Sequence, residues 1–392
     1  MPTMADYVRG CEAAGWVPVK TVERTFPRGA HLQFLSAAVQ AGSVSYTGML
    51  LRTVDGGLVT DSSVVLDRFD GEQVGLPPLA RSAAHPRVLP SSDGRLYLLW
   101  GESGDSKAEL APDSWEAVTT SIWYSMYTRG RGWSRPVELA RDSLGFWWYN
   151  GAGSFVQTPG GEIHIAVGDR RLVPGHIVHV VIPPRGEPRV KRIPLEGISS
   201  PYPAMLVSGD SVLIASGGTG EADRQRLRMY LFLSEDGGRS WGGPHVRAPW
   251  EVPNATTANL ARTVDGQLHL VLGQAAPSSV WTERFHHFSS PDGGRTWQFR
   301  EKMEVPTAVQ EPQLMGDHCG RLHFVFRDAN ASWTRILYTR WSGEGWGEPI
   351  RLFPDREPRS AVLLREASAM HLVLLYTGAE DSNVLTWARL TE

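Results

Sequence analysis

The sequence predicts an all-β protein built from one repeated structural unit. Two octapeptides, Ser234–Trp241 and Ser290–Trp297, share the pattern S-x-D-x-G-x-x-W and start 56 residues apart. A period near 50 residues indicates one supersecondary unit per repeat. No long apolar stretch has the 3.6-residue period of a helix, whereas the 41 glycines and 27 prolines are typical of short strands joined by turns.

Each octapeptide contains the residues that a tight turn requires. Asp236 and Asp292 can accept hydrogen bonds from amides of their own turns, and the glycines tolerate a positive φ. The Ser and Thr hydroxyls can add local bonds, and the tryptophan can fold back over the turn. We therefore expect both octapeptides to stabilise tight turns between strands.

A second pattern repeats along the chain: a strand, a turn with Asp-Gly or Gly-Gly, and an apolar strand that often contains histidine. Seven copies occur, at residues 49–59, 87–100, 155–167, 204–215, 259–272, 313–326 and 361–374. A third strand and a fourth with Trp, Gly and Pro follow several copies, as at 132–139 and 345–352. The pattern predicts a single β-propeller of four-stranded blades. Seven blades are expected, with six as the alternative because the first copy is degenerate.

The two ends of the chain predict how the propeller closes. The last repeat lacks a fourth strand after Asn383–Leu390, and the N-terminal segment Gly15–Val22 has the matching pattern. We expect the first strand to complete the last blade, because closure protects edges that would otherwise stay open. Residues 1–392 are thus predicted to form one domain, with residues 1–29 as the closing strand and lead-in.

Charge and composition argue against several classes of function. The net charge is −3 and no basic run occurs, so nucleic-acid binding is not indicated. No secretion signal or run of 18 apolar residues is found, so no membrane partner is expected. Cys11 and Cys319 alone do not indicate a disulfide framework. The sequence predicts a cytoplasmic protein, and its 35 arginines against four lysines are typical of a GC-rich bacterial genome.

A polar residue ends the second strand in most of the repeats. The aligned positions are Glu102, Asp169, Gly218, Gln274, Asp328 and Tyr376. Because one rim of every blade converges on the axis, we expect these side chains to face a shared cavity; the alternative is that they are solvated strand ends. Two carboxylates in one cavity can act as acid and base if burial separates their pKa values. Glu102, Asp169 and Asp328 are candidate acids and bases, Tyr376 is a candidate proton relay or nucleophile, and Gln274 is a candidate for substrate binding.

Arginines and aromatic residues near the strand entrances are further candidates for substrate binding. Arg87, Arg327 and Arg359 come from repeats two, six and seven, and their forked guanidinium groups suit a carboxylate or sulfate. The alternative is that they neutralise nearby acids. Trp148 and Tyr149 can stack on a sugar, or they can fill space between blades.

The repeated histidines His164, His269, His323 and His371 do not predict a metal site. They occupy the same position in separate blades, so we expect them to lie far apart and to satisfy local backbone groups. No set of histidines has the spacing of zinc ligands. Neither a metal nor a cofactor is predicted.

The octapeptides resemble the Asp-box of the sialidase-like β-propellers, over roughly residues 85–390. Arg87-Val-Leu-Pro90 is similar to the Arg-x-x-Pro signature of the hydrolases in this superfamily, with Pro86 in place of the usual aromatic residue. The resemblance implies a tyrosine nucleophile, an acidic proton donor and two more arginines. The nearest matches are Tyr376, Glu102 or Asp169, Arg327 and Arg359. None stands in a diagnostic context, so the resemblance does not imply a true sialidase.

Together these features predict an intracellular β-propeller enzyme that acts on a small polar ligand in an axial pocket. The ligand would be a sugar, a glycoside or an intermediate of secondary metabolism. The expected chemistry is acid–base catalysis, such as glycoside hydrolysis, elimination, or cyclisation or isomerisation. Two alternatives stay open: a lectin-like propeller that binds carbohydrate without catalysis, and a protein-interaction scaffold. A lectin predicts several similar pockets, and a scaffold predicts an axis without a defined pocket.

Overall fold

The structure is a computed structural model. It describes residues 15–24, 30–40, 43–54, 57–68, 74, 77, 83–90, 94–103, 119–146, 154–169, 175–195, 198–199, 203–219, 227–242, 252–276, 282–328, 335–353, 358–366, 369–377 and 383–391. These residues form β-strands and turns, with no helix among them. Within these ranges, no helical segment could therefore span a bilayer.

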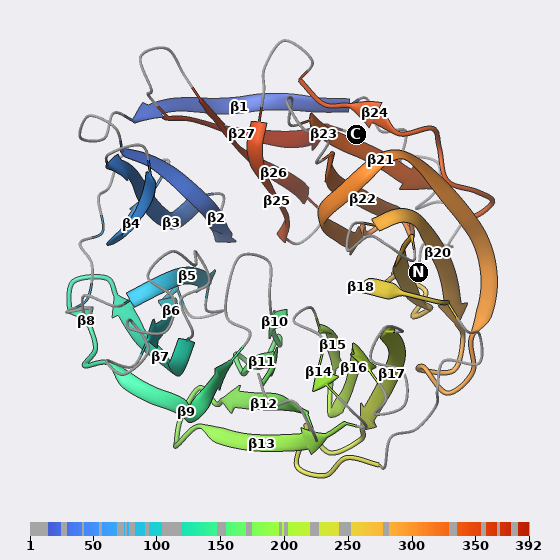
Figure 1. Ribbon diagram of the computed structural model, residues 1–392, viewed down its shortest axis with the longest axis horizontal. Helices are drawn as coiled ribbons and strands as arrows, with labels where there is room; N and C mark the ends of the chain where they lie inside the picture. Colours follow the sequence, from blue (N-terminus) through green and yellow to red (C-terminus); the bar gives the residue numbers. More distant parts are fainter. Residues whose placement is uncertain are drawn as a thin grey trace, which may run out of the picture.

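The described strands form six hydrogen-bonded sheets arranged around a common centre (Figure 1). The first sheet contains β2 (Ala30–Gln40), β3 (Ser43–Val54) and β4 (Gly57–Arg68). The second contains β5 (Ala83–Pro90), β6 (Leu96–Ser103), β7 (Thr119–Thr128), β8 (Gly132–Trp133) and β9 (Val137–Phe146). The third contains β10 (Ser154–Gln157), β11 (Ile163–Gly168), β12 (His176–Ile182) and β13 (Arg189–Pro194).

The remaining three sheets complete the circuit in Figure 1. The fourth contains β14 (Ile198–Ser199), β15 (Ala204–Ser208), β16 (Ser211–Thr219) and β17 (Leu227–Ser234). The fifth contains β18 (Ala255–Arg262), β19 (Leu268–Ala275), β20 (Thr282–Ser290), β21 (Gln298–Gly316), β22 (Leu322–Asp328), β23 (Arg335–Trp341) and β24 (Ile350–Arg351). The sixth contains β25 (Pro358–Glu366), β26 (Ala369–Thr377), β27 (Asn383–Thr391) and β1 (Gly15–Arg24).

The first strand of the chain lies in the same sheet as the last three. β1 pairs antiparallel with β27, from Gly15 opposite Thr391 to Arg24 opposite Asn383. The order across the sheet is β1-β27-β26-β25. β1 therefore covers an edge of β27 that would otherwise be exposed.

β21 is unusually long and joins two groups of strands. Its first half pairs with β20, and its second half pairs with β22. The register with β22 shifts between Gln310 and Gln313, which marks a β-bulge. Because β21 continues through both groups, β18 to β24 form one seven-stranded sheet.

Six of the seven sequence repeats coincide with the first two strands of a blade-like unit, as 87–100 does with β5 and β6. The copy at 49–59 is an exception, because it falls on β3 and β4, one strand later than the others. The first hairpin of that sheet instead joins β2 to β3, and the intervening Ala41-Gly42 lacks the Asp-Gly or Gly-Gly that identified the other copies. The expected register of the first repeat was therefore wrong.

The core lies between neighbouring sheets, and each central strand contributes side chains to two layers. On β19, Leu270 and Leu272 pack with the β15–β17 strands, whereas Val271 packs with Phe285 and Phe324. All of these side chains are nearly inaccessible to solvent. Burying a side chain of this size contributes about 1.5–3 kcal/mol. Because both faces of these strands are covered, the second strand of each repeat is almost continuously apolar.

The two octapeptides form the turns that their residues predicted. In the second, the Asp292 carboxylate accepts hydrogen bonds from Ser290 Oγ at 2.9 Å and from the Thr296 amide at 2.8 Å. Trp297 folds back and donates its Nε1–H to Gly294 O at 3.0 Å. None of these residues lines the axial cavity described below.

The repeated histidines contact side chains of the next strand rather than backbone groups. His164 Nδ1 lies 3.1 Å from His179 Nε2, and His269 Nδ1 lies 3.0 Å from His287 Nε2. His323 Nδ1 lies 2.9 Å from the Tyr338 hydroxyl. The expectation that each would satisfy a backbone group was wrong, because the third strand carries a polar ring two residues from the position that pairs with each of these histidines. No cluster of three or more potential metal ligands occurs among the described residues.

Candidate functional site

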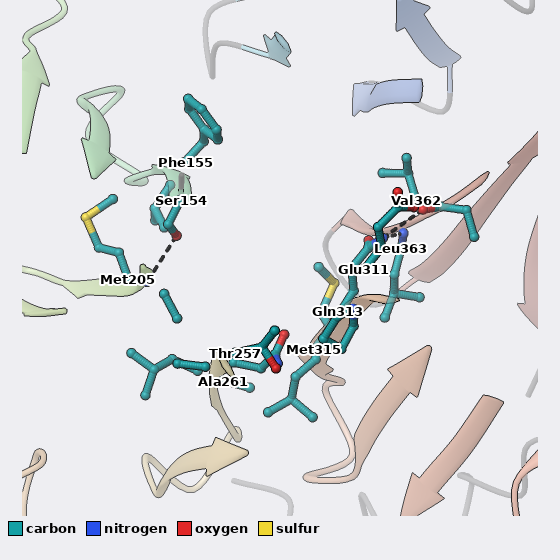
Figure 2. Close-up of a pocket in the computed structure, with 18 of the residues that line it drawn as sticks. Ser154, Phe155, Met205, Thr257, Ala261, Glu311, Gln313, Met315, Val362 and Leu363 are labelled. Atoms are coloured by element: carbon teal, nitrogen blue, oxygen red, sulfur yellow. Dashed lines mark hydrogen bonds between the residues drawn. The ribbon is translucent and has the colours of Figure 1, made fainter. Parts of the chain in front are cut away.

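The innermost strands enclose an axial cavity of about 820 Å³. Its lining comes mainly from seven strands: β2, β5, β10, β15, β18, β21 and β25. Figure 2 shows Ser154 and Met205 on one side of this space, Thr257 below it, and Glu311 and Gln313 opposite. The volume lies in the range of sites that enclose a whole small molecule, about 300–1,000 Å³.

Side chains join three pairs of neighbouring inner strands and help to fix the cavity wall. Ser36 Oγ accepts a hydrogen bond from the Val88 amide at 3.1 Å, which joins β2 to β5. Ser154 Oγ accepts one from the Met205 amide at 3.0 Å, which joins β10 to β15. Gln313 joins β21 to β25, because its amide donates to Ala361 O at 2.7 Å. These bonds hold the strands at a defined spacing around the cavity.

Glu311 is the one acidic residue among the described residues that line the cavity. Its φ is 50°, a left-handed conformation that is uncommon for a residue other than glycine. The β-bulge of β21 contains this residue, and such bulges redirect side chains near active sites. The Glu311 side chain is 15% exposed, so its carboxylate is largely shielded from solvent.

Two arginines accompany this carboxylate. Arg327 Nη2 lies 3.4 Å from Glu311 Oε1, and it also donates to Gln310 Oε1. Burial lowers the pKa of Arg87 to about 10, and the negative charge of Glu311 opposes this shift. The Arg87 guanidinium lies over the Phe155 ring, 5.8 Å from its centre. Both arginines are cationic near neutral pH and can bind an anionic group.

The wall formed by β18 and β20 carries neutral polar side chains and one arginine, Arg262. Thr256, Thr257, Asn259 and Thr282 all line the cavity there. The Thr256 and Thr282 hydroxyls lie 2.8 Å apart and share a hydrogen bond. The cavity therefore combines one carboxylate, Glu311, with arginines on several strands, and it has a group of neutral polar side chains on β18.

Among the predicted binding residues, Arg87 and Arg327 both line the cavity. The side chain of Arg359, on β25, lies outside the described part of the chain, as do Trp148 and Tyr149. Gln274 is not a lining residue, and its Oε1 lies 2.7 Å from His286 Nε2.

The predicted catalytic residues occupy equivalent strand positions but do not line the cavity. Glu102, Asp328 and Tyr376 lie opposite Ala83, Val309 and Pro358, in the pairs nearest the start of each inner strand. Glu102 accepts a hydrogen bond from Trp100 Nε1 at 2.9 Å.

Asp169 is fully buried, and its carboxylate contacts His176 of the same sheet. It accepts a hydrogen bond from the His176 amide at 2.9 Å and lies 3.0 Å from His176 Nδ1. Asp328 and Tyr376 are also buried, at 3% and 2% exposure.

The sequence analysis missed Glu311, Thr257 and Asn259 as candidate site residues. It aligned the repeats on the second strand, whereas these residues belong to inner strands. A usable signal was present in Val309-Gln-Glu-Pro-Gln313, where an acidic residue interrupts an inner strand directly before proline. Aligning the repeats on their first strands would have exposed it.

The fold and the cavity define a β-propeller of the sialidase-like superfamily. Residues 194–389 match the family model of the BNR repeat-like domain. The match spans half of the chain, and the chain belongs to this family. A comparison with curated proteins found no match.

Solved structures share the fold at low sequence identity. The polysaccharide lyase Uly1 has a TM-score of 0.56 and 12% identity, over 93% of this chain and 90% of that one. Trypanosoma rangeli sialidase, in complex with a difluoro-nononic acid, has a TM-score of 0.50 and 12% identity, over 81% of this chain and 54% of that one. BBS1N in complex with ARL6DN has a TM-score of 0.52 and 12% identity, over 96% of this chain and 97% of that one. At such identities the similarity concerns the fold alone.

Proposed function

We propose that this protein is a carbohydrate-active lyase that cleaves a glycoside of an acidic sugar in the axial cavity, with Glu311 as the base. The observation that carries the proposal is the position of Glu311: a shielded carboxylate in the cavity wall, in a left-handed conformation, beside Arg327. Strained backbone and shielded charge are common at active sites.

A seven-bladed ring is part of this proposal. Seven inner strands contribute to the cavity lining, and the two halves of β21 pair with different partners, as expected for strands of two consecutive blades. The pairing of β1 with β27 supports closure by the first strand. A ring of this kind would give one axial site at which all blades meet.

The charges around Glu311 support an acidic sugar as the ligand. Arg87 and Arg327 lie at the cavity, and forked guanidinium groups suit a sugar carboxylate. The bound nononic acid of the sialidase with the same fold is also an acidic sugar. Neutralising such a carboxylate would make the adjacent C–H bond more acidic.

Elimination requires one base, whereas hydrolysis by the usual route requires two carboxyl groups. In the proposed step, Glu311 removes the proton from the carbon beside the sugar carboxylate. The arginines stabilise the negative charge that develops on the carboxylate. A double bond forms between this carbon and the next ring carbon, the bond from that next carbon to the glycosidic oxygen breaks, and the proton passes from Glu311 to the oxygen, which leaves with the neighbouring sugar. A polysaccharide lyase with the same fold is consistent with this chemistry.

Ultraviolet absorbance of the unsaturated product tests the proposal. The full-length protein is incubated with uronic-acid polysaccharides, and initial rates are compared for the wild type, Glu311→Gln, Glu102→Gln and Asp169→Asn. Loss of a general base should lower the rate of the Glu311→Gln variant by at least about a hundredfold. The other two variants should keep most of the rate. Full activity of Glu311→Gln, or no unsaturated product from the wild type, would overturn the proposal.

A further inference from the structure

The axial cavity extends along the length of two inner strands. Its lining runs without a break from Thr256 to Arg262 on β18 and from Val309 to Gly316 on β21. In Figure 2, Glu311 and Met315 lie one after the other along β21. At about 3.3 Å per residue, the stretch of β21 from Glu311 to Gly316 is about 16 Å long. The cavity therefore has two ends, and the proposed catalytic base occupies only one of them.

The end away from Glu311 is built around Gly316. A Cβ at position 316 would lie 2.4 Å from Arg262 O, so β18 and β21 are in close contact there. On the other side, Arg365 of β25 donates a hydrogen bond from Nη1 to Gly316 O at 2.9 Å. Arg262 and Arg365 thus lie on either side of Gly316, at the same level of the axis, and both line the cavity.

The hydrogen bonds of these two arginines do not neutralise their charge. Arg262 donates from Nη1 to Ser208 Oγ on β15, and Arg365 donates to the carbonyl oxygen of Gly316. Both acceptors are neutral, and each bond uses one of the several N–H donors of a guanidinium group. Within the described lining the only carboxylate is that of Glu311, at the opposite end.

Two aspartates lie in the turns next to the arginines, and each of them is held by its own turn. Asp317 Oδ2 lies 2.6 Å from Arg321 Nε and 3.1 Å from His323 Nε2. Asp265 Oδ1 accepts a hydrogen bond from Thr263 Oγ1 at 2.6 Å. Neither aspartate lines the cavity. The lining at this end is therefore positively charged.

We propose that Arg262 and Arg365 form a second anion-binding subsite, so that the preferred ligand is an oligosaccharide with two acidic units. This inference rests on the proposed function, which positions the first acidic unit at Arg87 and Arg327. Guanidinium groups are suitable partners for a second sugar carboxylate. The cavity volume of about 820 Å³ leaves room beyond one sugar ring. A single acidic sugar held beside Glu311 would leave the second subsite without its anion.

Replacing both arginines should separate the second subsite from the first. The double variant Arg262→Gln, Arg365→Gln removes two positive charges and keeps polar side chains at this end. The double variant Arg239→Gln, Arg295→Gln is the matched control, because it removes the same charge from exposed arginines of the octapeptide turns. Ser208→Ala is a second control, since it removes a hydrogen-bond partner of Arg262 but leaves the charge.

Isothermal titration calorimetry with two probes tests the subsite. The probes are a disaccharide of glucuronic acid and a neutral hexosamine, with one carboxylate, and the tetrasaccharide that repeats this unit, with two. Every protein carries Glu311→Gln, so that the probes stay intact. Without further changes, this protein should bind the tetrasaccharide at least about tenfold more tightly, because hydrogen bonds to a second charged group are added. The Arg262, Arg365 double variant should reduce this preference to about one, with disaccharide affinity unchanged. Both controls should keep most of it.

The outcomes separate this inference from the proposed function. If both probes bind equally, or if the Arg262, Arg365 double variant keeps the preference, the second subsite is overturned while the acidic-sugar site stands. If this variant loses affinity for both probes and melts earlier, or if the Arg239, Arg295 control loses the preference equally, the arginines act through structure or net charge and the subsite is overturned as well. If neither probe binds, the acidic-sugar proposal fails and the subsite fails with it.

Discussion

Glu311 combines a left-handed backbone, a shielded carboxylate and a neighbouring arginine. A φ of 50° in a residue other than glycine costs about 1–3 kcal/mol and persists only where the surroundings enforce it. Pro312 does not explain this conformation, since the residue before a proline favours extended backbone with a negative φ. The bulge therefore presents one carboxylate to the cavity at some cost in stability.

Residue-level prediction from the sequence succeeded for Arg87 and Arg327, which line the cavity. Both stand next to an easily identified feature: Arg87 begins an Arg-x-x-Pro segment, and Arg327 precedes Asp328 at a strand end. Glu311 was missed because the repeats were aligned on their second strands and because its position depends on a bulge. A bulge shifts the register by one residue and leaves little trace in the alternation of polar and apolar residues.

The buried histidines predict how stability depends on pH. Burial lowers the pKa of His179 and of His287 to about 3, and that of His269 to about 4. In the unfolded chain these histidines have a pKa near 6.5. Between about pH 6.5 and 4 they therefore bind protons in the unfolded chain but not in the folded chain. Stability is therefore complete above pH 6.5 and falls as the pH decreases. Each fully buried histidine contributes a slope of about 1.4 kcal/mol per pH unit.

Chemical denaturation between pH 7 and pH 4.5 measures this slope. Aspartates with lowered pKa values, such as Asp292 at about 2, lose their contribution only below their unfolded value near 3.8 and lie outside this window. His287→Gln should reduce the slope relative to the wild type. A stability that is constant between pH 7 and 4.5 would show that these histidines are not held neutral.

At the level of elements, the hairpins of the inner and second strands were predictable because turn residues lie between the two strands. The second strands have both faces buried, so their apolar runs are nearly continuous, as in 163–167. The continuity of β21 was not predictable in this way. Sequence analysis began a repeat at Gln313, whereas the strand already starts at Gln298. The break between two repeats carries no turn signal there.

β1 offers a test of closure at the level of a single element. Deleting residues 1–24 should lower the free energy of unfolding by several kcal/mol, because β27 loses its backbone partner and each lost hydrogen bond contributes about 1 kcal/mol. The edge-to-face contact of Trp16 with Tyr338, at 5.8 Å, is lost as well. Thermal melts compare this deletion with the removal of residues 1–12 alone.

A synthetic peptide of residues 13–26 provides the decisive control for the deletion. Added in trans, it should restore much of the lost melting temperature, because the free edge of β27 can accept it. Equal stability of the deleted and full-length chains would contradict closure by the first strand.

For the whole molecule, the sequence was sufficient for the all-β class, the superfamily and the position of the octapeptides away from the axial cavity. These features depend on local patterns that recur along the chain. A prediction based on several copies still holds when one copy matches the pattern poorly. The axial site depends on which side chains of separate strands converge. That convergence is set by the register between sheets, which no single segment encodes. Arg87 and Glu311 are 224 positions apart in sequence, yet both line the cavity.

The most direct test of the whole account is a crystal structure of Glu311→Gln bound to an acidic oligosaccharide. The variant should retain binding while turnover is slowed, so that the intact ligand can be observed. We predict that the sugar carboxylate lies within hydrogen-bonding distance of Arg87 and Arg327, with the carbon that loses its proton facing residue 311. A ligand bound instead at Glu102, Asp169 and Asp328, or on the outer hairpins, would contradict the assignment of the axial cavity as the active site.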